Sequence, residues 1–148
     1  MIKRIDHIAI AVRSLEESKK KIEDLLGAKF IVEAINEKGQ YKVAIFRVGE
    51  NIFTLLESTS PEGFVAKHVE KFGETMQHMG VEVEDLNKFI DHLHSRGVKT
   101  SGYMEVEGVR KEILVGPKNP LGVILQVVEW LGDYKKTSPE ERMTKVWG

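Results

Sequence analysis

The sequence predicts an α+β fold in which two βαβββ modules form a half-open mixed β-barrel, with a linker helix and a short C-terminal helix added. The first observation behind this prediction is an internal repeat. Residues 5–15 match residues 76–86 at an offset of 71 positions (78 − 7), which makes His7 and His78 equivalent. Self-similarity at a fixed offset indicates a duplicated structural module.

The second observation is another pair of equivalent polar residues. Residues 53–57 match residues 125–129 at an offset of 72 positions (126 − 54), so Thr54 and Gln126 correspond. Both residues lie inside short apolar segments that have the composition of strands. A duplicated module that directs one polar side chain per strand toward a shared centre can build one site from four strands.

The first module is expected over residues 2–58. Its opening segment, residues 2–12, is rich in Ile, Ala and Val, which indicates a strand buried on both faces. Ser14 and Glu17 form a capping-box pattern for the helix that follows, and Gly27 ends that helix. Three further strands are expected near residues 29–35, 41–48 and 51–58.

The second module is expected over residues 76–129 and repeats this order. Residues 59–74, which precede it, have no counterpart in the repeat and are expected to form a linker helix with Pro61 at its first position. The strand at 76–84 leads to Asp85, which is a good helix cap. The remaining strands are expected near residues 98–104, 109–115 and 121–129.

The tail, residues 130–148, extends beyond the repeat. Ser138 followed by Pro139 favours the start of a helix, expected near residues 139–146. The aromatic residues of the tail indicate that it docks on a surface of the protein; these are Trp130, Tyr134 and Trp147.

Composition narrows the function classes. A chain of 148 residues with 41% hydrophobic residues is expected to form a single domain with a packed core. The formal net charge of −1 gives no electrostatic reason to expect a nucleic acid or an anionic membrane as partner. The absence of cysteine excludes disulfides, thiolate catalysis and cysteine metal sites. No apolar leader or membrane span is visible, so a cytoplasmic protein is expected.

Side chains alternate between the two faces of a strand, and this alternation fixes the neighbours of each candidate residue. If His7 faces the interior, Ala9 does so as well; the same argument groups His78 with Gly80. In the third strands, a register that directs Val43 inward also directs its counterpart, Glu112, inward.

His7 and His78 are candidate metal ligands, with Thr54 and Gln126 as further oxygen donors. Histidine is the commonest ligand of transition metals, and duplication would bring the two histidines together. The alternative interpretation is a pair of core histidines with satisfied hydrogen bonds. The other histidines are expected on the surface or on helix faces; these are His68, His92 and His94.

Four segments together resemble the vicinal oxygen chelate superfamily, namely residues 6–12, 53–61, 78–83 and 122–127. Within that superfamily the chain is most similar to the methylmalonyl-CoA epimerases, through residues 55–61 and the segment that follows. The resemblance implies a cup-shaped barrel around a divalent metal, such as Co, Zn, Ni or Mn. It also implies racemisation of a 2-methylacyl-CoA by metal-assisted transfer of the α-proton.

The resemblance assigns the metal site residue by residue. The epimerases use two histidines, a glutamate or glutamine on the fourth strand, and a glutamate on the eighth strand. His7 and His78 match the histidines, whereas Thr54 and Gln126 stand at the other two positions. This donor set supplies no negative charge to a dication, so a degenerate metal site is expected.

Glu112 is the candidate catalytic base. It is the second-module counterpart of Val43, the strand position at which some epimerases carry a catalytic glutamate. A base that removes an α-proton is usually a carboxylate, and Gln126 cannot act as one. The alternative is a strand carboxylate that pairs with Arg110 or Lys111 in solvent.

Other functions are compatible with these residues. The chain could be a non-catalytic small-molecule-binding member of the superfamily, similar to the bleomycin resistance proteins, or a glyoxalase-type lyase. An extradiol dioxygenase is disfavoured because Gln126 replaces the glutamate ligand. The expected partners are a small molecule such as an acyl-CoA and a second copy in a homodimer. The phosphates of an acyl-CoA could meet basic residues at the rim of the cup, namely Arg47, Arg110 and Lys118.

Overall fold

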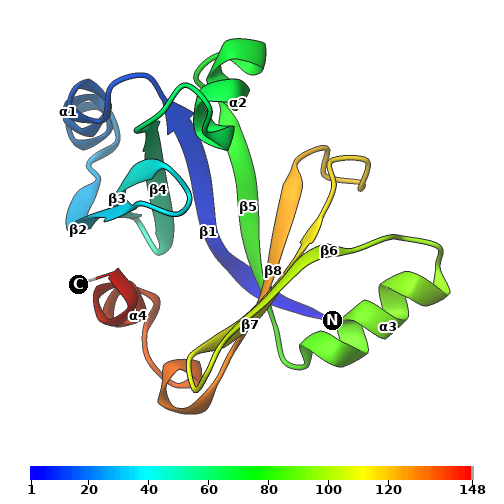
Figure 1. Ribbon diagram of the computed structural model, residues 1–148. Helices are drawn as coiled ribbons and strands as arrows, with labels where there is room; N and C mark the ends of the chain where they lie inside the picture. The colour runs from blue at the N-terminus through cyan, green and yellow to red at the C-terminus, as the bar shows by residue number, and fades with distance from the viewer. Residues whose placement is uncertain (148) are drawn as a thin grey trace. The chain divides into compact units, whose positions relative to one another are not determined.

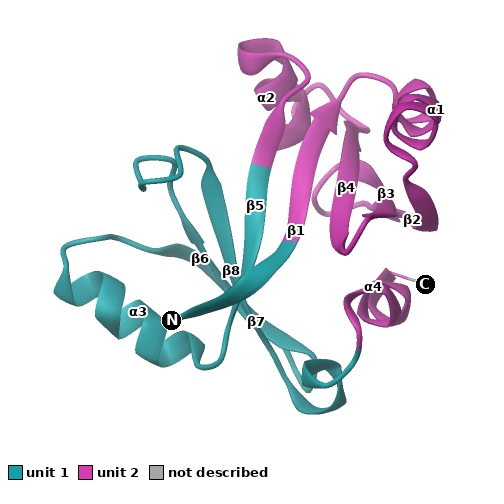
Figure 2. Cartoon of the chain, turned by 180° about the vertical axis from the view of Figure 1, so that it is seen from behind, with its two compact units in different colours: residues 1–6, 78–137 teal, residues 7–77, 138–148 magenta. Residues whose placement is uncertain are grey.

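The computed structural model describes residues 1–147 and confirms the predicted α+β class with two βαβββ modules. Eight strands form one mixed sheet of order β2-β3-β4-β1-β5-β8-β7-β6. The chain divides into two compact units (Figure 2). Unit 1 comprises residues 1–6 and 78–137, and unit 2 comprises residues 7–77 and 138–148.

The order of elements in Figure 1 is that of the two predicted modules with a helix after each. The elements of the first module and the linker are β1 (Ile2–Val12), α1 (Leu15–Leu26), β2 (Lys29–Asn36), β3 (Tyr41–Val48), β4 (Asn51–Ser58) and α2 (Phe64–Phe72). Those of the second module and the tail are β5 (Met76–Val83), α3 (Leu86–Ser95), β6 (Ser101–Val106), β7 (Arg110–Val115), β8 (Ile124–Trp130), the 3-10 helix η1 (Gly132–Lys135) and α4 (Pro139–Trp147).

In unit 2, one face of the sheet packs against α1. β1 pairs with β4 in parallel, and β3 pairs antiparallel with both β4 and β2. Ser14 caps α1 by accepting a hydrogen bond from the Glu17 amide, as predicted, and Gly27 ends the helix in the left-handed conformation. The core between α1 and the strands contains Val12, Leu15, Ile22, Ala44, Phe46 and Leu55.

The opposite face of the unit 2 sheet packs against the C-terminal helix. Helix α4 contacts β2 and β4, and Met143 on α4 is only 4% exposed. Figure 1 shows α1 and α4 on opposite sides of β2, β3 and β4. The tail therefore docks as predicted, and both faces of this sheet carry a helix.

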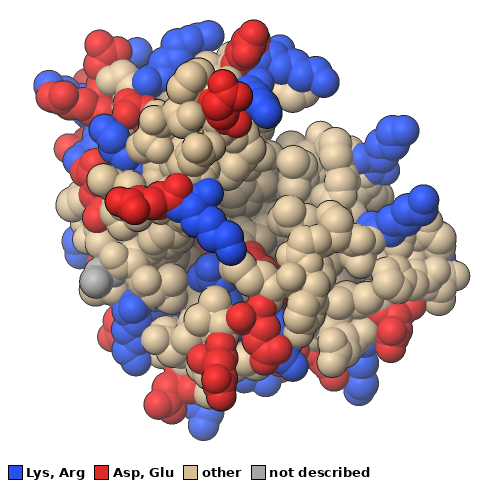
Figure 3. Space-filling view, in the orientation of Figure 1, with Lys and Arg blue, Asp and Glu red and all other residues tan. Residues whose placement is uncertain are grey.

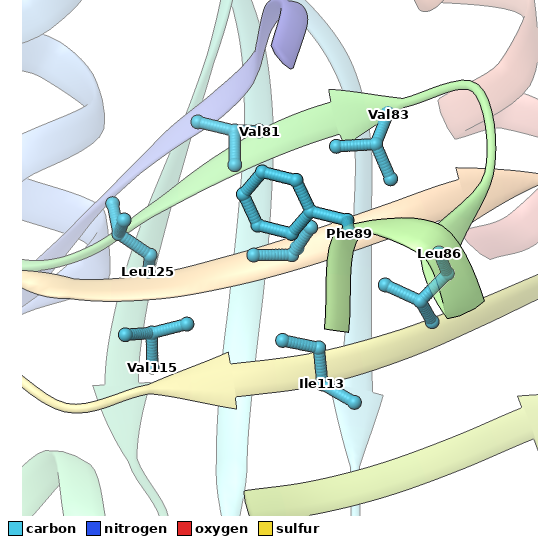
Figure 4. Packing of buried hydrophobic residues seen from close by; sticks show 8 residues of the cluster. Val81, Val83, Leu86, Phe89, Ile113, Val115 and Leu125 are labelled. Atoms are coloured by element: carbon cyan, nitrogen blue, oxygen red, sulfur yellow. The ribbon is translucent and has the colours of Figure 1, made fainter. Parts of the chain in front are cut away.

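In unit 1, α3 covers one face of the sheet. β5 pairs with β8 in parallel, and β7 pairs antiparallel with β8 and β6. Phe89 of α3 points into the strands and packs among their apolar side chains (Figure 4). The buried residues of this core are Val81, Val83, Leu86, Phe89, Ile113, Val115, Leu125 and Val127.

Three predicted boundaries were wrong. The linker helix starts at Phe64, not beside Pro61, because the Ser60 hydroxyl accepts a hydrogen bond from the Glu62 amide in a turn before the helix. β6 begins at Ser101, three residues later than predicted, with a register shift before Met104. β8 begins at Ile124 because Asn119 bonds to loop backbone up to Val123 and keeps that loop out of the strand.

Within residues 1–147, the structure contains no helix that is long and apolar enough to cross a membrane.

Candidate functional site

A group of polar side chains lies on one face of the unit 1 sheet. Ile113 and Val115 of β7 belong to the core beneath α3. Since side chains alternate along a strand, Arg110, Glu112 and Leu114 project from the other face. We call this second side the α3-distal face.

The register extends the α3-distal face to β8 and β5. Gln126 lies opposite Leu114 on β7 and beside Gly80 on β5. His78, two residues before Gly80, therefore shares the face with Gln126. Glu112 lies opposite Val128, so this pair is the next one on the same face after Leu114 and Gln126.

Glu112 is buried and bonded within the sheet. The residue is 6% exposed, and its Oε2 atom accepts a hydrogen bond from the Gln126 amide. Its Oε1 atom lies 3.7 Å from Nε of Arg110. The inward orientation predicted for Glu112 agrees with this arrangement. The alternative interpretation, a carboxylate paired with Arg110 or Lys111 in solvent, is confirmed in the pairing with Arg110 and wrong in the exposure, because Glu112 is buried.

Arg110 brings a buried donor to the same place. Its Nε atom is buried and has no hydrogen-bond partner among residues 1–147. The guanidinium lies over the Trp130 ring at 5.6 Å, and the Trp130 indole donates to Asp6 Oδ1 at 2.8 Å. The stacking contact fixes the direction of the guanidinium, so the N–H remains available to an acceptor beside Glu112.

Apolar side chains surround the polar group on the α3-distal face. Met104 lies opposite Glu112, and Val106 opposite Arg110. Together with Leu114, these side chains are 38–42% exposed. An exposed apolar surface around a few converging polar groups is typical of a ligand site.

The remaining predicted residues belong to unit 2. Thr54 on β4 lies between Ala9 on β1 and Ile45 on β3, so it projects from the face turned away from α1. Alternation along β1 places His7 on this α1-distal face as well. Thr54 is buried, at 7% exposure. Val43 lies on the same face and provides no carboxylate there.

The predicted donors do not fit a resident dication. A threonine hydroxyl and a glutamine amide add no charge to the imidazoles of His7 and His78. The amide of Gln126 is, moreover, bonded to Glu112. Within residues 1–147, no three or more His, Asp or Glu side chains are grouped as a metal site.

Sequence reasoning placed Arg110 at a rim or, as the alternative for Glu112, in an ion pair in solvent; it did not predict a buried pair. The two residues are separated by one position in a strand, and this spacing alone indicated a shared face. The contacts with Gln126 and Trp130 depend on the register of β7 against β8, which no local pattern of residues indicates.

A second charged cluster in unit 1 makes the stability of the fold depend on pH. Glu84 pairs with Lys135 at 2.9 Å and with Lys3 at 2.8 Å. The hydrogen bonds from Lys135 and then from Lys3 hold the pKa of Glu84 at about 2, below the ordinary value of 4.5. Because the folded pKa is depressed, the contribution of Glu84 to stability is present above pH 4.5 and is lost as the pH falls toward 2.

We expect the carboxyl carbon of Glu84 to titrate near pH 2 by nuclear magnetic resonance at low salt. Since the group is at the surface, 1 M NaCl should move the midpoint toward the ordinary value (the Debye length is then about 3 Å). In a Lys135→Gln variant the midpoint should also rise. A midpoint above pH 4 in the wild-type protein at low salt would contradict the pairing.

Charges of both signs alternate over the surface visible in Figure 3, and neither sign gathers into a broad patch there. This distribution accompanies the formal net charge of −1. The charges relevant to the candidate site are therefore those of two side chains, Glu112 and Arg110, and not those of a broad charged surface.

Comparison with known families gives one match over most of the chain. The model of the Glyoxalase/Bleomycin resistance protein/Dioxygenase superfamily matches residues 6–113. Among curated proteins, the uncharacterized protein YqjC of Bacillus subtilis is 26% identical over 132 residues, covering 88% of this chain and 94% of YqjC.

Two solved structures with similar folds are methylmalonyl-CoA epimerases. The enzyme from Mycobacterium tuberculosis superposes with a TM-score of 0.77 at 24% identity, covering 92% of this chain and 93% of that one. A variant of the Streptomyces coelicolor enzyme, in complex with 2-nitronate-propionyl-CoA, gives a TM-score of 0.77 at 21% identity, covering 89% and 100%. At these identities the likeness shows a shared fold.

Proposed function

Because the chain belongs to the Glyoxalase/Bleomycin resistance protein/Dioxygenase superfamily, we propose that it catalyses proton transfer at C2 of a 2-methylacyl-CoA. The observation that carries this proposal is the buried carboxylate of Glu112, which lies 3.7 Å from an Arg110 Nε–H that has no hydrogen-bond partner in residues 1–147. A base and a hydrogen-bond donor at one place are the two groups that enolisation of a thioester requires.

In this proposal Glu112 removes the proton from C2 of the thioester. The electron pair of the C–H bond becomes the C1–C2 double bond of the enolate, and negative charge moves to the thioester oxygen. The Nε–H of Arg110 donates a hydrogen bond to that oxygen. Return of the proton from Glu112 to C2 restores the thioester and regenerates the carboxylate; if the proton on Glu112 has first exchanged with solvent, C2 carries a solvent hydrogen.

Gln126 positions the base. Its amide donates to Oε2 of Glu112, which leaves Oε1 as the oxygen nearer to Arg110. The exposed apolar groups of Met104 and Leu114 provide a surface for the acyl portion. Support for an acyl-CoA comes from the structurally similar epimerase bound to 2-nitronate-propionyl-CoA.

Exchange of the C2 proton with solvent tests the proposal, and the configuration of the product at C2 need not be measured. Methylmalonyl-CoA is incubated with the protein in D2O, and the C2 proton signal is followed by nuclear magnetic resonance. We expect the signal to disappear faster than in a protein-free sample. A rate equal to the protein-free rate, under conditions where calorimetry shows binding, would contradict an isomerase.

The second candidate is a small-molecule-binding protein without catalysis. It is favoured by the hydrogen bond that Gln126 already makes to Glu112, since this bond occupies one oxygen of the proposed base. Saturable binding of methylmalonyl-CoA with no C2 exchange would establish this second function. Exchange above the background rate would exclude it.

A further inference from the structure

Two buried carboxylates lie on the α3-distal face, each beside one arginine. Glu82 on β5 and Glu112 on β7 are both register partners of Val128 on β8, so they share this face. Glu82 is 1% exposed and accepts a hydrogen bond from Nε of Arg4. Glu112 lies 3.7 Å from Nε of Arg110. A carboxylate that arrived with a ligand would therefore compete with Glu82 or Glu112 for a cation.

The position of the base limits the charge that a substituent on C2 can carry. A base removes a proton from a carbon that lies about 3–3.5 Å from its oxygen, so a carboxylate bonded to C2 would lie within about 5 Å of Glu112. Two like charges at that separation repel each other where little water is present. A cation between them would offset the repulsion. In the proposed reaction, however, Arg110 donates to the thioester oxygen, and Arg4 is bonded to Glu82.

The accessible surface beside Glu112 is apolar. Met104 on β6 lies opposite Glu112, and Leu114 is the next residue of β7 on the same face. These two residues are 42% and 38% exposed, so a ligand can contact their side chains. A carboxylate placed on this surface would lose water without gaining hydrogen bonds, whereas an alkyl group would be stabilised by leaving water.

We propose that C2 of the substrate carries an alkyl chain beside its methyl group, and that the substrate is a 2-methyl-branched fatty acyl-CoA. The alkyl chain lies on Met104 and Leu114. A 2-carboxyacyl-CoA such as methylmalonyl-CoA is then the slower substrate of the same site. This selectivity rests on the proposed function, because it requires Glu112 to act on C2.

2-Methylbutyryl-CoA and methylmalonyl-CoA are the probes for this selectivity. Loss of the C2 proton in D2O is followed with each compound and the wild-type protein. Each kcat/KM is divided by the rate constant with which a buffer base exchanges the same thioester, which removes the difference in acidity at C2. We expect the normalised kcat/KM to be higher for 2-methylbutyryl-CoA by about tenfold or more, because the second carboxylate of methylmalonyl-CoA would be left unpaired.

Two results would overturn the alkyl substrate, and they differ in what they say about the reaction. An equal or higher normalised kcat/KM for methylmalonyl-CoA would exclude the alkyl preference and leave proton transfer by Glu112 intact. Exchange of neither compound above the protein-free rate would exclude proton transfer at this site and the alkyl substrate together.

Leu114→Lys adds a cation to the apolar surface. Because Leu114 is partly exposed, the lysine ammonium can reach water while the sheet stays folded. We expect the preference between the two probes to shift toward methylmalonyl-CoA by about fivefold, the upper range for a partly exposed ion pair. The comparison of the two probes in the wild-type protein is independent of this variant.

Tyr103→Lys is the matched control. The Tyr103 hydroxyl bonds to Glu105, which lies opposite Lys111 on the other face of the sheet, so the same charge is added on the opposite side. Its preference should equal that of the wild-type protein. An equal shift in both variants would indicate an effect of overall charge. Either that result, or no shift in a Leu114→Lys protein that is folded by circular dichroism, would overturn the placement of the alkyl chain.

Discussion

Glu112→Gln is expected to lower the rate of C2 proton exchange by about a thousandfold, the scale on which a positioned general base contributes. The variant cannot accept the C2 proton, whereas the oxygen of the new amide can still accept the hydrogen bond from Gln126. The fold should therefore persist. The measurement is the loss of the C2 proton of methylmalonyl-CoA in D2O, beside a thermal unfolding curve.

Glu107→Gln is the matched control for this variant. Glu107 lies exposed in the turn between β6 and β7, so the same change in charge occurs close to the site without touching it. Its exchange rate should equal that of the wild-type protein. An unchanged rate in Glu112→Gln would exclude Glu112 as the base, and an equal loss in both variants would point to a general effect of charge.

Gln126→Glu is expected to lower the free energy of unfolding by about 3 kcal/mol at pH 8. The change places a second carboxylate against the buried carboxylate of Glu112 and replaces a hydrogen bond with repulsion. At pH 5 the loss should be smaller, because one carboxyl of the pair takes up a proton and donates to the other. Urea unfolding at both pH values measures the difference.

The same variant has a distinctive response to metal. Two adjacent carboxylates on the face that carries His78 would form a charged donor set of the kind that dications bind. We expect Co²⁺ or Zn²⁺ to restore stability to Gln126→Glu and to leave the wild-type protein unchanged. Gln40→Glu, in a turn of unit 2, is the charge control. Stabilisation of all three proteins by the metal would indicate a metal site independent of Gln126.

Much of the fold could be predicted from the repeat and from local signals. Equivalence of His7 with His78 fixed the order of elements in both modules. Ser14 and Asp85 marked the helix starts correctly, because a cap involves only neighbouring residues. Pro61 misled the prediction of the linker helix, since serine side chains stabilise a turn at that point.

The site was less predictable because it depends on pairing between distant segments. Alternation along β7 was sufficient to orient Glu112. Its bond to Gln126 follows from the antiparallel register of β7 with β8, which strand patterns alone do not determine. The contact of Glu140 with Lys29 and Arg47 joins residues more than 90 positions apart (140 − 47) and had no local signal. The metal ligands suggested by the resemblance, the homodimer and the substrate stay predictions.

We propose that proton transfer in unit 1 uses Glu112 and Arg110 without a resident metal. The most direct test is the C2 exchange rate of the wild-type protein before and after treatment with EDTA, with metal content measured in both samples. We expect substoichiometric metal and the same rate in both samples. A rate that disappears with EDTA and returns with Co²⁺ or Zn²⁺ would contradict it.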